Sequence, residues 1–146
     1  QLVIEVTEGA YPVLRDPAVT SQLDSLRARG LRTALDDFGT SGGMLMTLLT
    51  MPVDMIKIDR VLVARLEDDD AGEAVISGLL NTARELRISV VAKGIESEPQ
   101  STHLRKLGCR FGQGHLFAKA LDRTDVTNLL LSAQDISQSD KRIGLR

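Results

Sequence analysis

The sequence predicts an α/β fold of parallel strands joined by helical crossovers. Short apolar, β-branched runs alternate with segments of helical periodicity about five times along the 146 residues. The runs are continuous rather than alternating with polar residues, as is typical of strands covered on both faces. No G-x-G-x-x-G motif follows the first run, which counts against a dinucleotide-binding sheet. Periodicity alone leaves open whether the sheet is doubly wound or closed into a barrel.

Five segments are predicted to be strands because each is short and mostly apolar or β-branched. The fifth is the weakest, because it contains two glycines. The predicted strands are residues 2–6, 31–36, 53–58, 88–92 and 109–114.

The helices after the first two strands are predicted from capping and breaking signals. Asp16 is a suitable N-cap, Pro17 stands at the first helical position, and Gly30 is a suitable terminator. A short helix is expected at about 44–49, and Pro52 ends it because proline breaks a helix interior.

Two later helices have equally clear starts. Asp70 is expected to cap a helix that runs to about Leu86 and buries one apolar face. Ser97 with Gln100 three residues on is a capping-box signature, and Gly108 closes that helix.

The domain is predicted to span residues 2–133, with a last helix at about 124–133 and a polar tail at 134–146. Because the chain opens with a buried strand, we expect it to be the C-terminal portion of something longer. A half barrel would have unclosed sheet edges and an uncovered apolar interior. We therefore expect it to need its N-terminal half or to pair with a second copy as a homodimer.

Composition is that of a soluble globular domain, with 42% hydrophobic and 26% charged residues. The formal net charge of −2 gives no electrostatic reason to expect a nucleic-acid polymer or an anionic membrane as partner. The single cysteine, Cys109, excludes an internal disulfide and fits a reducing, cytoplasmic location. No apolar run approaches the roughly 18 residues that a membrane helix needs.

Each predicted strand ends with polar residues suited to phosphate or metal chemistry. In a barrel of parallel strands, the C-terminal strand ends meet at one mouth, where active sites lie. Three carboxylates, a lysine and an amide at this mouth indicate a metal site for a phosphodiester, and the second lysine counts against full catalysis. The residues are Glu5, Asp36, Asp37, Lys57, Lys93 and Gln113.

Taken singly, these residues have plainer explanations. Glu5 can lie at an exposed strand end, and the Asp36-Asp37 pair can be a loop or a helix cap. Adjacent acids in an extended strand point to opposite sides, and they can share two ions only if the backbone turns. Lys57 can snorkel to solvent, and Gln113 can be part of a plain turn between two glycines.

As a set, five strings resemble the EAL family of cyclic di-GMP phosphodiesterases, in the family's order and spacing over about residues 2–121. The resemblance implies a (β/α)8 TIM-type barrel of which this chain is the later part. It also implies hydrolysis of cyclic di-GMP to the linear dinucleotide pGpG with two Mg²⁺ or Mn²⁺ ions. The strings are IEVTE (4–8), ALDDFGT (34–40), PVDMIKIDR (52–60), VVAKGIE (90–96) and LGCRFGQGHLF (107–117).

The resemblance also implies roles for individual residues. Glu5 and Asp36 correspond to metal ligands, and Asp37 holds the second metal. Lys57 orients the attacking water or a phosphate oxygen, with Gln113 beside the same centre.

Further residues have supporting roles by the same resemblance. Glu8 braces the loop after DDFGT, and Glu96 is a loop-bracing residue. Asp59 and Lys119 are the expected substrate contacts.

The chain departs from the family at three places, and the first two favour a degenerate domain. Lys93 replaces an acid that serves as a second-metal ligand or general base, and a charged ammonium can do neither. It can instead pair with Asp37 or with a phosphate. The loop at 40–44 also differs from the family's, and the strand that names the family would lie before Gln1.

The leading hypothesis is therefore a degenerate EAL domain in cyclic di-GMP signalling, which binds the nucleotide or partners with little or no hydrolysis. The alternative is an active metal-dependent phosphodiesterase, and a third possibility is a module that binds only proteins. Upstream sensory or regulatory domains are the expected partners within the longer protein.

Overall fold

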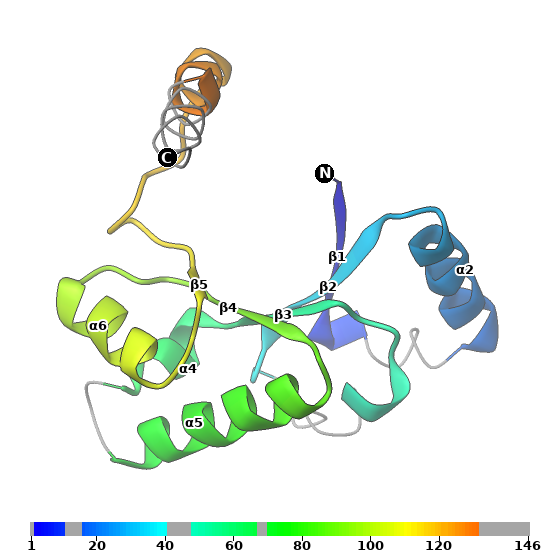
Figure 1. The fold of residues 1–146 in the computed structure, drawn as a ribbon, viewed down its shortest axis with the longest axis horizontal. Helices are drawn as coiled ribbons and strands as arrows, with labels where there is room; N and C mark the ends of the chain where they lie inside the picture. The colour runs from blue at the N-terminus through cyan, green and yellow to red at the C-terminus, as the bar shows by residue number, and fades with distance from the viewer. Residues whose placement is uncertain (1, 11–15, 41–47, 67–69, 132–146) are drawn as a thin grey trace, which may run out of the picture. The chain divides into compact units, whose positions relative to one another are not determined.

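The computed structural model of this chain describes residues 2–10, 16–40, 48–66 and 70–131. The chain divides into two compact units, Gln1–Leu116 and Phe117–Arg146. The first unit contains the sheet and its helices (Figure 1). Within the second unit, residues 123–131 are helical, in agreement with the helix predicted there. The predicted tail, 134–146, lies outside the described residues, and the extent of the domain stays a prediction.

The first unit is a five-stranded parallel sheet whose strands lie in the order of the sequence, β1-β2-β3-β4-β5. Each crossover therefore steps to the next place in the same direction, whereas a doubly wound sheet reverses direction at a switch point. This is the winding of a barrel, and it confirms the predicted later βα units of a (β/α)8 fold (Figure 1). The strands are β1 Val3–Thr7, β2 Arg32–Phe38, β3 Met55–Ile58, β4 Ser89–Ala92 and β5 Phe111–Gly112.

The helices that follow Asp16 and Ser97 begin where the capping signals predict, whereas Asp70, expected to be a cap, is itself the first residue of its helix. The Asp16 carboxylate accepts a hydrogen bond from the Ala18 N–H at 2.8 Å, with Pro17 first in the helix. Ser97 and Gln100 form the complete capping box. The helical elements of the first unit are η1 Glu8–Ala10, α2 Pro17–Ala28, α4 Arg60–Ala64, α5 Asp70–Glu85 and α6 Glu98–Lys106.

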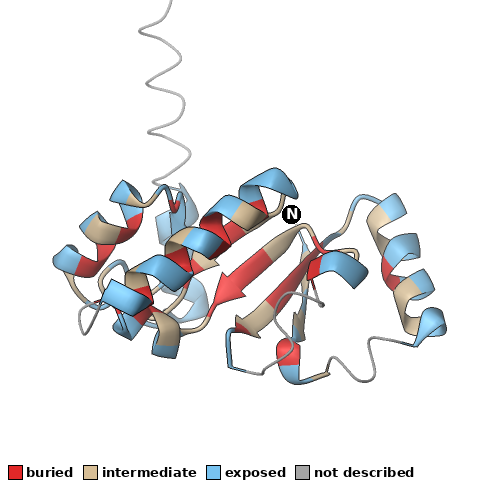
Figure 2. Ribbon diagram, turned by 90° about the horizontal axis from the view of Figure 1, so that it is seen from below, coloured by how far each residue is buried: buried red, intermediate tan, exposed pale blue. Residues whose placement is uncertain are grey.

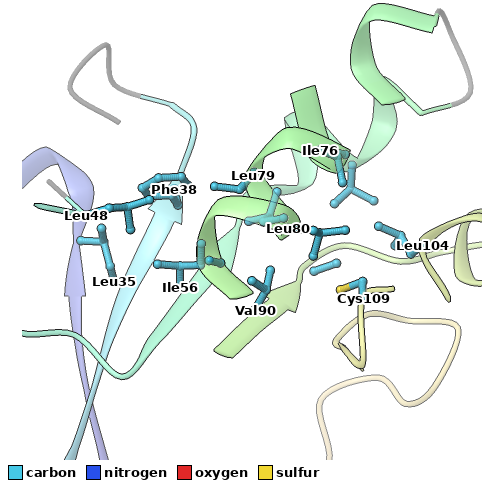
Figure 3. Packing of buried hydrophobic residues seen from close by; sticks show 14 of the residues in the cluster. Leu35, Phe38, Leu48, Ile56, Ile76, Leu79, Leu80, Val90, Leu104 and Cys109 are labelled. Carbon is cyan, nitrogen blue, oxygen red and sulfur yellow. The ribbon is translucent and has the colours of Figure 1, made fainter. Parts of the chain in front are cut away.

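The hydrophobic core lies between one face of the sheet and the helices that cover it. Leu35 and Ile56 are fully buried on neighbouring strands and belong to the same hydrophobic cluster as Leu79 of α5 (Figure 3). Figure 2 shows the same division, because the buried parts of α5 lie on its inner side and its exposed parts on its outer side. Because side chains alternate along a strand, the residues between these core positions point to the opposite face of the sheet.

The structure corrects some predicted boundaries. Strand β2 extends to Phe38, two residues beyond the predicted end, so Asp37 lies within the strand rather than after it and Asp36 is not its last residue. A short helix, α4, follows β3 and was not predicted. The helix predicted at 44–49 falls largely on residues 41–47, outside the described part, while 48–50 are helical. None of the helices in the described ranges has the length and apolar character needed to cross a membrane.

Candidate functional site

Parallel pairing places the predicted site residues on one face of the sheet, opposite the helix-covered core. Glu5 pairs with Ala34, and Ala34 pairs with Met55. Asp36 and Lys57 lie two residues further along their own strands, so strand alternation places both on the face that Glu5 shares. The same face continues to β4, because Lys57 pairs with Val91, two residues before Lys93.

A bulge in β2 brings the two adjacent aspartates to the same side. The register with β3 shifts between Leu35 and Phe38, and Asp37 has a left-handed φ of 55°. Asp36 also accepts a hydrogen bond from the Asp37 N–H at 2.9 Å, which fixes its carboxylate against the turned backbone. Of the two arrangements left open by the sequence, the structure therefore has the turned one, in which both carboxylates converge.

Lys93 lies at the point of convergence. Its Nζ is 2.7 Å from Oδ1 of Asp36 and 2.7 Å from Oδ1 of Asp37. Its backbone N–H donates to the Ile58 carbonyl at 3.0 Å, so the residue is anchored to β3 as well as to β4. Lys93 thus pairs with Asp37, one of the two alternatives that the sequence left open, and it pairs with Asp36 as well.

Lys57 forms the second ion pair of this face. Its Nζ donates to both oxygens of Glu5 at 2.8 and 2.9 Å and lies 4.0 Å from Oδ1 of Asp36. The Lys57 side chain is only 10% exposed, so its charge needs this partner. Acid and base alternate along what we call the charge row: Glu5, Lys57, Asp36, Lys93 and Asp37.

The charge row changes the acid–base behaviour of its central members. Burial acts to raise the pKa of Asp36, but the hydrogen bond from Lys93 and the other nearby donors outweigh it and hold that pKa below its usual value. Burial likewise acts to lower the pKa of the Lys93 ammonium, but the hydrogen bonds to Asp36 and Asp37 raise it above its usual value. Both shifts favour the charged forms, so the ion pair persists at neutral pH.

Glu8 makes a buried contact within the DDFGT string, whereas its expected bracing of the loop after that string stays a prediction. It is 1% exposed, and its Oε2 accepts a hydrogen bond from the Gly39 N–H at 3.0 Å. Gly39 directly follows the end of β2 and has a φ of 103°, a conformation that glycine adopts without strain. The contact therefore ties η1 to the turn that leaves the two aspartates.

Gln113 lies in a segment held close to the end of β4. Its N–H donates to the Ala92 carbonyl at 2.8 Å, and its carbonyl accepts from the Ile95 N–H at 3.1 Å. A Cβ at Gly114 would lie 2.1 Å from the Ile95 oxygen, so only glycine fits there. The close approach at Gly114 is thus made to the protein's own backbone, and the role of the Gln113 side chain stays a prediction.

Two of the remaining predicted residues make other contacts within the first unit. Asp59 is the N-cap of α4, where its side chain accepts from the Val61 N–H at 2.9 Å. The Glu96 side chain is exposed, and its backbone N–H donates to Gln100 Oε1 at 2.9 Å. Lys119 belongs to the second unit. Their supposed contacts with substrate or loop stay predictions, as does any role of the divergent loop, whose residues 41–47 lie outside the described part.

The carboxylates as they stand do not fit the two-cation centre that the resemblance implies. A divalent cation needs oxygens directed at a shared position, and here the Lys93 ammonium fills the position between Asp36 and Asp37. The ammonium has no lone pair to offer and repels a cation. Within the described ranges, no group of three or more His, Cys, Asp or Glu side chains is arranged to hold a metal.

Comparison with known proteins identifies the family. The EAL domain family model matches residues 1–120. The chain belongs to the EAL domain family. The recognition made from the five strings is therefore confirmed, together with the barrel fold that it implied.

The curated relatives are longer than this EAL chain. It is 37% identical over 131 residues to the probable cyclic di-GMP phosphodiesterase PdeG of Escherichia coli K12, and the match covers 90% of the chain and 26% of PdeG. It is 36% identical over 121 residues to the cyclic di-GMP phosphodiesterase RocR of Pseudomonas aeruginosa, covering 82% of the chain and 30% of RocR. The chain thus spans about a quarter to a third of these two proteins.

Solved structures of EAL domains share the fold. The EAL domain of Mycobacterium smegmatis DcpA matches with a TM-score of 0.82 and 31% identity, over 89% of this chain and 58% of that one. The PaMucR phosphodiesterase, solved as a complex with c-di-GMP, matches with a TM-score of 0.75 and 35% identity, over 86% of this chain and 50% of that one. The chain therefore corresponds to 50–58% of these two solved chains.

The ion pair between Lys57 and Glu5 was not anticipated from the sequence. The two residues are 52 positions apart, and neither carries a local signal for the other. The alternation of side chains along β1 and β3 predicts that the two residues share a face, but only once the strand pairing and register are known.

Proposed function

We propose that this EAL domain acts in cyclic di-GMP signalling by binding the nucleotide, with little or no hydrolysis. The observation that carries the proposal is the Lys93 ammonium, held 2.7 Å from both Asp36 and Asp37. The class of ligand is supported by relatives named as cyclic di-GMP phosphodiesterases and by EAL structures solved with cyclic di-GMP.

Hydrolysis is disfavoured because position 93 lacks a base. A protonated lysine has three donors and no acceptor, so it cannot take a proton from water. Its pKa is raised by Asp36 and Asp37, which keeps it protonated. Losing a general acid or base typically costs about 10²–10⁴-fold in rate. The carboxylates that remain are engaged in ion pairs rather than directed at a cation.

An active phosphodiesterase is the second candidate, because acids and a lysine remain on one face. Lys57 lies within 4.0 Å of both Glu5 and Asp36, and Asp37 is linked to Asp36 through Lys93. Because the loss of a general acid or base lowers the rate by about 10²–10⁴-fold, such an enzyme would show only residual turnover.

Hydrolysis and binding are tested in parallel on the full protein. Conversion of cyclic di-GMP to pGpG is followed by chromatography with Mn²⁺ present, and binding is measured by calorimetry. We expect saturable binding and a turnover at least 100-fold below that of an active EAL enzyme assayed alongside. A Lys93→Glu variant should gain turnover, whereas Lys106→Glu, the same charge change at an exposed position of α6, should not.

The outcomes separate the candidates. Turnover comparable to the active enzyme would refute the proposal and establish the phosphodiesterase. Absence of saturable binding would also refute it and leave a module that binds only proteins.

The partners and location follow as parts of the same proposal. A relative 32% identical to this chain is named oxygen sensor protein DosP, which supports an upstream sensory domain. Pairing with a second copy and a cytoplasmic location, expected from the open sheet edges and the single cysteine, complete the proposal. Size-exclusion chromatography with light scattering measures the copy number.

A further inference from the structure

We propose that the Lys93 ammonium takes the place of a divalent cation in this site, so that the site excludes metal and binds an anionic phosphodiester without it. The first half concerns only this chain's charge row. The second half rests on the proposed function, because it names cyclic di-GMP as the ligand.

The need for a cation between the two aspartates comes from the backbone. The β2 bulge and the left-handed Asp37 turn both carboxylates to one side, where two negative charges repel unless a positive charge lies between them. The Lys93 Nζ lies 2.7 Å from an oxygen of each, within the range of strong charge-assisted hydrogen bonds. The cation is covalently attached to β4, so it cannot be removed by a chelator.

The charge balance also reduces the need for a metal when an anion binds. Three carboxylates and two ammonium groups leave the charge row with a formal charge of −1. A glutamate at position 93 would give four carboxylates and one ammonium, hence −3, which requires divalent cations before an anion can approach. Lys93 thus removes most of the repulsion that metals would otherwise neutralise.

Lys93 retains a donor for a phosphate oxygen. An ammonium has three N–H groups, and Lys93 uses two of them on Asp36 and Asp37. Lys57 likewise directs two at the oxygens of Glu5. The Lys93 side chain is 21% exposed, so its third N–H can meet a ligand.

The first arm of the test measures metal alone. Mn²⁺ is titrated against the full protein and followed by electron paramagnetic resonance, for the wild type and for Lys93→Arg, Lys93→Glu and Lys106→Glu. We expect Lys93→Glu to bind Mn²⁺ at least tenfold more tightly than the other three. Asp36→Asn added to Lys93→Glu should abolish the gain, which places the ion at the charge row. Wild-type affinity equal to that of Lys93→Glu would overturn the inference.

The second arm measures cyclic di-GMP binding by calorimetry in EDTA and in Mg²⁺. We expect wild-type affinity to be the same within a factor of two in both buffers, and Lys93→Arg to behave alike. Lys93→Met, checked for folding by circular dichroism, should lose at least tenfold in EDTA. Wild-type binding that requires Mg²⁺ would overturn the inference.

The two arms keep the failures distinguishable. A wild type that excludes Mn²⁺ but binds no nucleotide in either buffer would refute the proposed function and the ligand half, while the replacement of the metal by Lys93 stands. A wild type that binds nucleotide only with Mg²⁺ would refute the inference and leave nucleotide binding in place.

Discussion

Replacing Glu8 tests whether the buried carboxylate holds the turn that follows the two aspartates. Glu8 is 1% exposed, and its Oε2 accepts the Gly39 N–H at 3.0 Å. A hydrogen bond to a charged group contributes about 1.5–3 kcal/mol, and truncation also removes the packing of the side-chain stem. Because Gly39 is exposed and water can partly replace the acceptor, we expect Glu8→Ala to cost about 2 kcal/mol. Glu8→Gln keeps a neutral acceptor and should cost about 1 kcal/mol.

The loss should be concentrated at the turn. A cost of about 2 kcal/mol in local opening corresponds to amide exchange about 30-fold faster. Denaturant unfolding measures the free energy of unfolding, and hydrogen exchange with mass spectrometry measures protection over residues 34–40. Glu85→Ala, at an exposed glutamate of α5, should change the free energy of unfolding by less than about 0.5 kcal/mol. Wild-type stability and unchanged protection of Gly39 in Glu8→Ala would show that the carboxylate does not hold the turn.

Three further predictions concern packing, capping and pH. Gly114→Ala, whose Cβ would lie 2.1 Å from the Ile95 oxygen, should destabilise by about 3 kcal/mol in denaturant unfolding, and wild-type stability would contradict the close approach. Ser97→Ala should cost about 1 kcal/mol by the same measurement, because it removes the N-cap of α6; Ser97→Asp should restore it. The pairing of Lys93 with Asp36, whose pKa is lowered, stabilises above the unfolded carboxyl pKa of about 3.9 and is lost below it. The pKa of Lys93 is raised, so the lysine stays charged up to about pH 9. The difference in the free energy of unfolding between wild type and Lys93→Met should therefore stay level from about pH 5 to 9 and shrink below about pH 4. A difference that grows in acid would refute the ion pair.

The local signals in the sequence predicted the helix starts well because capping is a short-range effect. Asp16 and Ser97 each bond to backbone within three residues, so composition alone reveals them. The predicted end of β2 was wrong because a strand end depends on long-range pairing. The sequence places acids at the end of an apolar run, but pairing with β3 continues past them to Phe38.

The sequence by itself determined the order of strands and helices, the family, and the presence of a lysine where the family has an acid. Only the tertiary structure decided that Lys93 bonds both aspartates and that Lys57 bonds Glu5. These partners are 52–57 residues apart in the chain, so the contacts depend on strand register and on the β2 bulge. A register shift of one residue turns every side chain to the other face, and no local pattern around Asp37 specifies its left-handed backbone.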